Sequence, residues 1–365
     1  MTAASPPSVR EAVRLRPGMY IGDTTDGSGQ HHMLWEVIAN VIDDHLRSGA
    51  TRATVTLEGP ACTVEDDGRG IPVDPDPEAP GRSLLERVMT EHHTTGTAFG
   101  DSPHVHVAPG LFGVGLCVVA ALSSTCEVEV ARGGRRWHVA YRRGEALGPL
   151  RDLGPTTATG TRLRFEPDAE IFAPRLPWDV AAIAARLTEL AALNPGMIFE
   201  LVADGARRTM CSPRGLLDLV LADAAGAEIA GEPVQLRGSL DDVDVEVVLA
   251  WTDGPARLRG FVSQFAATQG THVAGLMRGL ADAVQQVAPG DVSATRLAGA
   301  DALPRGLVAA VHVALYHPRW GEPTKDRLDS PEAGQAVAAV VGAGLAERLR
   351  ADPALREIVL AASRA

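Results

Sequence analysis

The stretch LWEVIANVIDDHL, residues 34 to 46, places two kinds of side chain on one expected helix. Its apolar residues recur at helical spacing, which predicts that one face enters a core; they are Leu34, Val37, Ile38, Val41, Ile42 and Leu46. A second face carries four oxygen-rich side chains, those of Glu36, Asn40, Asp43 and Asp44. Most polar stripes on amphipathic helices are solvated surface, so the stripe alone leaves its purpose open.

The bulk composition limits the class of protein. A chain of 365 residues with 45% hydrophobic content can bury a substantial core and, by length, form about two domains. Its net charge of -12 argues against general adhesion to nucleic acid. The four cysteines show no CxxC spacing, so we expect buried thiols and no zinc ribbon at Cys62, Cys117, Cys126 and Cys211. No apolar run suits a signal peptide or a membrane span, so we expect a cytoplasmic protein.

The elements around the opening helix mix strands and helices without regular alternation. In chain order we expect strands at 53–57 and 62–68, a helix at 82–93, a glycine-rich lid at 94–110, a helix within 110–123, a hairpin at 126–144 and a strand at 159–167. Strands and helices in this irregular order favour an α+β layered sandwich over a doubly wound sheet.

A domain boundary is expected between residues 200 and 235, where the strand pattern breaks. We place it at 215, with one domain at 1–215 and another at 216–365. The second part predicts strands at 242–251 and 306–316, a helix after 271 and an alanine-rich helix at about 331–350. It therefore forms a second α+β domain.

Two glycine-containing motifs could carry chemistry. EDDGRGIP, residues 65 to 72, puts an acidic pair at the end of a strand, where Asp66 could accept a hydrogen bond from an amino group such as that of adenine. It could equally be a simple Asp-Gly turn. PGLFGVG, residues 109 to 115, offers backbone N–H groups and a helix N-terminus that suit phosphate, although it is neither a Rossmann motif nor a P-loop.

Taken in order, these motifs resemble the ATPase fold shared by gyrase, heat-shock chaperones, histidine kinases and MutL. Several stretches narrow the resemblance to the B-type component of bacterial DNA gyrase or topoisomerase IV: VRLRPGMYIGDT, HHMLWEVIANVIDD, EDDGRGIPV, GLFGVGLCVVAALS, TGTRLRF, GTHVAG and PTKDRL. The resemblance runs from Val13 to the C-terminal helix. It implies a two-layer ATP-binding sandwich, a mixed sheet covered by helices, followed by a second α+β domain, the transducer.

The same resemblance implies roles for the polar stripe. Glu36 would be the general base that activates water, and Asn40 would give an oxygen ligand to Mg²⁺ held largely by ATP. Lys325 would reach the γ-phosphate from the second domain. Asp66 would bind the adenine amino group. The remaining implied nucleotide-binding residues are Val37, Val64, Arg69, Gly70, Ile71, Pro72, Met89, Gly110, Leu111, Gly113, Val114, Gly115, Arg132 at the rim, Thr161 and Leu163.

Several positions depart from the family pattern. Thr97 or Ala98 stands where the family lid has a lysine, Phe112 replaces a histidine and Pro323 replaces a glutamine. The N-terminal arm that would close a dimer is also short. These losses predict slow hydrolysis and a weak nucleotide-dependent homodimer.

The biological setting stays open at this stage. The chain could be the ATPase fragment of a topoisomerase that works with a gyrase A-like subunit and DNA, a stand-alone ATP-dependent switch, or an inhibitor-binding resistance protein. We expect no DNA cleavage by this chain alone, because the acidic DDVDVE stretch at 241–246 alternates like the solvent face of a strand. A metal-free lid is favoured over a zinc site at His92, His93, His104 and His106.

Overall fold

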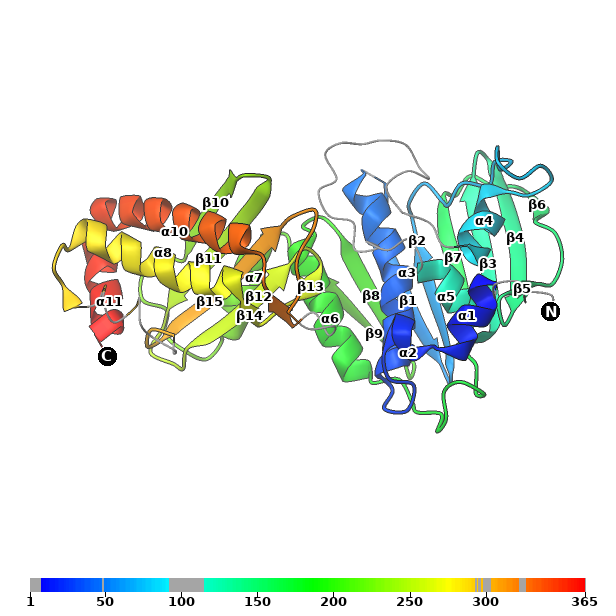
Figure 1. The fold of residues 1–365 in the computed structure, drawn as a ribbon, viewed down its shortest axis with the longest axis horizontal. Helices are drawn as coiled ribbons and strands as arrows, with labels where there is room; N and C mark the ends of the chain where they lie inside the picture. The colour runs from blue at the N-terminus through cyan, green and yellow to red at the C-terminus, as the bar shows by residue number, and fades with distance from the viewer. Residues whose placement is uncertain are drawn as a thin grey trace, which may run out of the picture. The chain divides into compact units, whose positions relative to one another are not determined.

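The computed structural model describes residues 8–47, 49–91, 115–292, 294, 297, 303–321 and 326–364. The chain divides into two compact units between Cys211 and Ser212 (Figure 1). The assignment of functional domains to 1–215 and 216–365 stays a prediction. No helix in the described ranges is long and apolar enough to cross a membrane.

The first unit is built on a mixed sheet. Among the described residues it has nine strands in the order β5-β4-β3-β7-β2-β1-β8-β9, with β6 beside β4. Their bounds are β1 (Arg52–Glu58), β2 (Ala61–Asp66), β3 (Ser123–Arg132), β4 (Arg135–Arg142), β5 (Glu145–Ala146), β6 (Arg151–Pro155), β7 (Gly160–Pro167), β8 (Ile198–Ala203) and β9 (Ala206–Cys211). Strand β1 pairs antiparallel with β2 and parallel with β8, which makes the sheet mixed.

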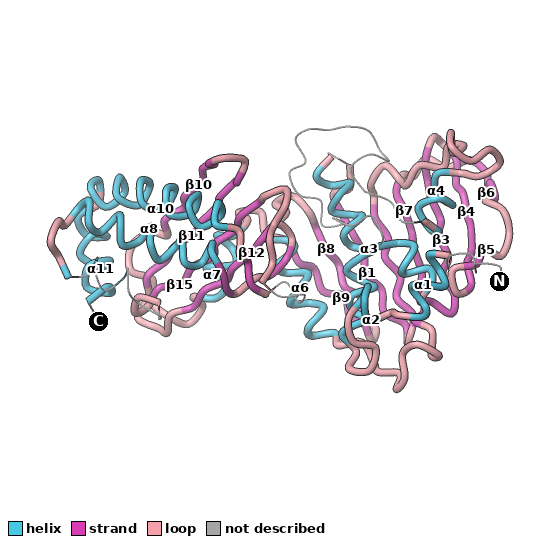
Figure 2. The backbone as a smooth tube through the Cα atoms, in the orientation of Figure 1, coloured by secondary structure: helices cyan, strands magenta, loops and turns pink. Residues whose placement is uncertain are grey.

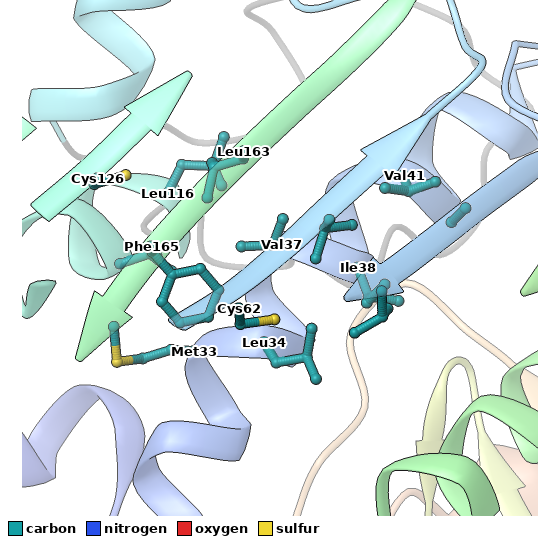
Figure 3. Packing of buried hydrophobic residues seen from close by; sticks show 14 of the residues in the cluster. Met33, Leu34, Val37, Ile38, Val41, Cys62, Leu116, Cys126, Leu163 and Phe165 are labelled. Carbon is teal, nitrogen blue, oxygen red and sulfur yellow. The ribbon is translucent and has the colours of Figure 1, made fainter. Parts of the chain in front are cut away.

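The helices of the first unit supply the second layer. They are α1 (Val9–Leu15), α2 (Gly18–Ile21), α3 (Ser28–Leu46), α4 (Leu84–Thr90), α5 (Gly115–Ala121) and α6 (Val180–Leu193). Helices α3, α4 and α5 lie over one face of the sheet (Figure 1). Capping boxes at Ser8 and Ser83 begin α1 and α4. The apolar face of α3 packs on buried strand residues such as Cys62 and Phe165 (Figure 3).

The two faces of the sheet differ because side chains alternate along each strand. Across β3, β7 and β2, the residues Val128, Leu163 and Val64 stand in register and are all buried. The next row is Glu129, Arg162 and Glu65, in which the arginine lies 3.9 and 3.8 Å from the two carboxylates. One face is therefore apolar and covered by helices, and the other is charged, which confirms the predicted two-layer α+β sandwich.

The second unit has its own sheet (Figure 2). It also has its own hydrophobic core. Among its described residues, five strands follow the order β10-β11-β15-β12-β13, and β14 pairs with β16. The strands are β10 (Val234–Leu240), β11 (Val243–Trp251), β12 (Arg257–Val262), β13 (Phe265–Ala266), β14 (Gln269–Gly270), β15 (Leu307–Ala314) and β16 (Arg327–Leu328). The helices are α7 (Leu216–Asp223), α8 (Thr271–Val287), α10 (Pro331–Ala351) and α11 (Pro353–Arg364).

Glycines let the two long helices of this unit approach closely. A Cβ atom on Gly275 of α8 would lie 2.4 Å from the carbonyl oxygen of Gly334 in α10. One turn later, a Cβ atom on Gly279 would lie 2.7 Å from the Cβ atom of Val341. Such distances are shorter than any normal contact, so these positions exclude larger side chains.

Three sequence expectations need correction. The helical spacing predicts Leu46 in the core, but at the last position of α3 it is 40% exposed. The expectation of a buried Cys211 is wrong, because this residue lies exposed on β9, the last strand of the sheet. The strand pattern does not break at residue 200, because β8 and β9 continue through it. In β9 only Met210 is buried, so no apolar alternation marks this strand in the sequence.

Candidate functional site

A cavity of about 270 Å³ lies in the first unit between α3, the segment that follows β2, and α4. Its size and mixed wall suit a small molecule with both apolar and polar groups. The lining residues are Val37, Asn40, Val41, Asp43, Asp44, Arg47, Val64, Asp66, Arg69, Gly70, Ile71, Pro72, Asp74, Leu84, Val88, Leu116, Arg132, Thr161 and Leu163.

Asp66 is fixed at the wall of this cavity by backbone groups. Its Oδ1 atom accepts hydrogen bonds from the amides of Gly68 at 2.9 Å and Thr161 at 3.2 Å. Burial raises the pKa of Asp66 to about 6, although these two amide bonds lower it. Neither bond uses Oδ2, so the carboxyl group can meet a hydrogen-bond donor of a ligand from a fixed position.

The glycines around Asp66 permit this arrangement. Gly160 has a φ of +129°, and a Cβ atom there would lie 2.0 Å from the carbonyl oxygen of Asp66. Gly70 has a φ of +76°, and its carbonyl oxygen accepts a hydrogen bond from Arg132 at 2.8 Å. Thr161 adds a third connection, since its Oγ1 atom accepts from the amide of Ile71 at 3.2 Å. The DDGRGI and TGT segments therefore form one continuous wall.

Asp44 of the polar stripe has a structural task. Its Oδ2 atom accepts from the amides of Arg69 at 2.9 Å and Ala50 at 3.1 Å, and its Oδ1 atom accepts from Nε of Arg69 at 2.7 Å. A Cβ atom on Gly68 would lie 2.1 Å from Oδ2. Asp44 therefore fastens the loop after β2 to the C-terminal end of α3.

Glu36 lies at the opening of α5. His32, one turn earlier on α3, places Nε2 at 3.3 Å from Oε1 of Glu36. A Cβ atom on Gly115, the first residue of α5, would lie 2.4 Å from Oε2. Glu36 and Gly115 are not among the cavity-lining residues, but the next residue, Leu116, is. The carboxylate thus has His32 as a partner, has no room for a side chain at Gly115 beside it, and is still 24% exposed, which leaves it accessible to a water molecule.

Asn40 presents a suitable ligand atom for a hard cation. Its Nδ2 atom donates to the backbone oxygen of Glu36 at 2.9 Å, which leaves the amide oxygen for a ligand. Mg²⁺ takes such oxygen ligands and usually shares them with phosphates and water. Among the described residues no group of three or more His, Cys, Asp or Glu side chains could hold a metal. A cation beside Asn40 would therefore depend on oxygens that a bound molecule supplies.

Most of the predicted nucleotide-binding residues line the cavity. Met89 is an exception: it is 0% exposed in the core, and its neighbour Val88 lines the cavity instead. Successive residues on a helix differ by about 100° in direction, so a shift of one position moves a side chain from cavity to core. Other predicted positions lie outside the described residues: Thr97, Ala98, Gly110, Leu111, Phe112, Gly113, Val114, Pro323, Lys325 and the four lid histidines, His92, His93, His104 and His106.

Several site residues carried no prediction. His32 has a sequence signal, since it stands four positions before Glu36 on one helical face. Arg47 has the same relation to Asp43. The apolar residues Leu84, Val88 and Leu116 have no such signal, because core and cavity positions look alike in a buried helix.

The chain matches known protein families over two regions. Residues 25–171 match the family described as histidine kinase-, DNA gyrase B-, and HSP90-like ATPase, and residues 215–365 match DNA gyrase B. The chain is 37% identical over 361 residues to the gyrase B protein of Thermus thermophilus, covering 96% of this chain. It spans 56% of that protein and 42% of the B-type component of the type 2 topoisomerase of Aquifex aeolicus.

Solved structures show the same similarity. The 43K ATPase domain of Thermus thermophilus gyrase B, in complex with an aminocoumarin, has a TM-score of 0.77 at 33% identity, covering 97% of this chain and 93% of that one. The topoisomerase IV ATP-binding domain of Francisella tularensis, in complex with a small-molecule inhibitor, has a TM-score of 0.75 at 26% identity, covering 97% and 96%.

Proposed function

Because the chain belongs to the family of the DNA gyrase B ATPase region, we propose that it binds ATP with Mg²⁺, hydrolyses it, and couples the nucleotide state to closure of two copies. The binding step is supported by the hydrogen bonding of Asp66. Two backbone amides donate to its Oδ1 atom, and neither donates to Oδ2. An adenine amino group would donate to Oδ2. The apolar residues Val37, Val64 and Leu163 on the cavity wall would contact the base.

Glu36 carries the hydrolytic step of the proposal. A water molecule beside its carboxylate attacks the γ-phosphorus, the bond from that phosphorus to the β–γ bridging oxygen breaks, and ADP and phosphate leave. The proton of the water passes to Glu36 and from there to phosphate. His32 positions the carboxylate through its contact of 3.3 Å. Mg²⁺ held at Asn40 would neutralise charge on the phosphates.

The rate and the assembly are also proposals. The sequence differences at Thr97, Ala98, Phe112 and Pro323 remove groups that would close on the phosphates, so we expect slow turnover and a weak nucleotide-dependent dimer. Lys325 would still provide one cation for the γ-phosphate. Because the chain spans about half of its curated relatives, work with a gyrase A-like subunit on DNA is proposed only for a larger assembly.

The decisive experiment separates binding from hydrolysis. Glu36→Gln should bind ATP as tightly as the parent does. Its rate of hydrolysis should fall by about 100-fold or more, because the side chain acts on water. Asp66→Asn should instead weaken binding about tenfold, because it leaves a buried polar mismatch. Calorimetry and phosphate release measure the two effects, with Glu58→Gln on the charged sheet face as the control. Turnover of Glu36→Gln equal to that of the parent would remove Glu36 as the base.

A further inference from the structure

An arginine of the N-terminal helix α1 binds the C-terminal end of α5. Arg14 donates from Nη1 to the carbonyl oxygen of Ala121, the last residue of α5, at 2.9 Å. Its Nη2 atom donates to Oδ2 of Asp168 at 2.8 Å. The last carbonyl groups of a helix have no partner within the helix and carry a partial negative charge. Arg14 therefore supplies α5 with a charged cap from a distant part of the chain.

Asp168 ties this cap to two further segments. Its side chain is 2% exposed, and its Oδ2 atom also lies 2.9 Å from Nε of Arg143. The amide of Asp168 donates to the carbonyl oxygen of Leu122, the residue after α5, at 2.9 Å. Helix α1, the turn after β4 and the segment after β7 thus meet where α5 ends.

The other end of α5 lies against the proposed base. A Cβ atom on Gly115 would lie 2.4 Å from Oε2 of Glu36, so the backbone leaves no room for a further carbon atom beside the carboxylate. Leu116, the next residue, lines the cavity. Burial raises the pKa of the Cys117 thiol to about 12, and the charge of Glu36 adds to this shift. The first turn of α5 is therefore in the immediate environment of Glu36.

Helix α5 is short and fully packed between these two ends. It has seven residues and is roughly 10 Å long. Every residue from Leu116 to Ala121 is buried. A close-packed interior transmits strain, because a helix inside it has little space to bend. A shift of the capped end should therefore move the residues beside Glu36 as well.

We propose that Arg14 is a positioning residue for hydrolysis, which acts through α5 to hold Gly115 beside the Glu36 carboxylate, where the attacking water would bind. The inference rests on the proposed function, because it requires Glu36 as the base. A small misplacement caused by a distant substitution can lower a rate by as much as about 100-fold. The loss should fall on kcat, since adenine binding depends on Asp66 and not on α5.

The test measures kcat by phosphate release and the affinity for ADP by calorimetry, both with Mg²⁺. Arg14→Met should lower kcat about tenfold and change the affinity for ADP by less than about twofold. Arg143→Met is the matched control, because it removes the other arginine beside Asp168 but no side-chain hydrogen bond to α5 among the described residues. It should keep the parent kcat.

A double-mutant cycle separates positioning from a purely structural role. When Glu36→Gln has already removed the base, adding Arg14→Met should lower the remaining rate by less than about twofold, because no base is left to position. An equal loss in both backgrounds would overturn the proposal. So would a folded Arg14→Met variant with the parent kcat.

A second variant keeps the proposal testable if Arg14→Met does not fold, which thermal unfolding shows. Arg14→Lys keeps a positive charge for Asp168 but replaces two donor nitrogen atoms by one, so kcat should still fall, by about threefold. The parent kcat in this variant would overturn the proposal in that case. Failure of the proposed function looks different, since Glu36→Gln alone would then hydrolyse ATP as fast as the parent.

Discussion

The two units bury ionisable groups of opposite kinds. The first unit buries carboxyl groups at its cavity, where burial raises the pKa of Asp66 to about 6 and that of Asp43 to about 7. The second unit buries histidines at its sheet, where burial lowers the pKa of His272 to about 4 and also lowers that of His312. The carboxyl groups line a cavity and can meet a ligand, whereas His272 is 0% exposed and its Nε2 atom donates to the carbonyl oxygen of Ala267.

This difference teaches that the same desolvation has opposite pH consequences in the two units. A group whose folded pKa is raised stabilises the fold at low pH and loses that contribution as pH rises through the folded pKa. A histidine whose folded pKa is lowered contributes stability above its unfolded pKa of about 6.5, and this is lost as pH falls towards the folded value.

The largest expected effect is acid destabilisation of the second unit. The fold keeps His272 neutral. As the pH falls from 6.5 to 4, this preference should lower the free energy of unfolding by on the order of 3 kcal/mol. The charge of His312 also lowers the pKa of His272. Burial lowers the pKa of His312 itself, while Glu246 and Asp244 oppose that shift. Hydrogen exchange read separately on peptides of each unit, at pH 7 and pH 4.5, measures the effect. Equal acid responses of β15 and of β1 would break the comparison.

A second prediction concerns packing in the same unit. Gly275→Ala should destabilise the second unit by about 1–3 kcal/mol, because the new methyl group would meet the backbone of Gly334. Chemical denaturation followed by fluorescence of Trp251 and Trp320 measures this loss. Gly342→Ala is the matched control: its nearest contact would be 3.3 Å from a side-chain atom of Asp282, and alanine favours a helix. A similar loss of stability in both variants would mean that the close approach of the two helices does not determine the effect of the substitution.

The smallest expected effect concerns a buried carboxyl group of the first unit. Asp43→Asn should raise the stability of the ligand-free first unit at pH 8 by about 1 kcal/mol, because it removes a buried charge without a partner. At pH 4 the parent carboxyl group is protonated in the folded state, so the gain should disappear. Thermal unfolding at both pH values measures it. A gain that is the same at pH 4 would show that the charge of Asp43 is already compensated.

Much of the candidate site can be predicted because its polar residues follow backbone features that the sequence states directly. Asp66 comes at the end of a strand before glycines, and Asn40 and Glu36 share a helical face. Apolar contacts are harder to predict. Met89 and Val88 are adjacent and similar, and only the packing of α4 decides which of them meets the cavity.

By itself, the sequence determined the two-layer fold, the order of its motifs and the family, because hydrophobic periodicity and glycine positions are local properties of the chain. The tertiary structure alone decided what each residue of the polar stripe does. Asp44 accepts hydrogen bonds from Arg69 and Ala50, Glu36 has His32 as its partner, and Asp43 keeps an oxygen without a partner among the described residues. Side chains of the same kind on one helix differ in this way because hydrogen bonding and burial depend on which distant segments pack against each of them.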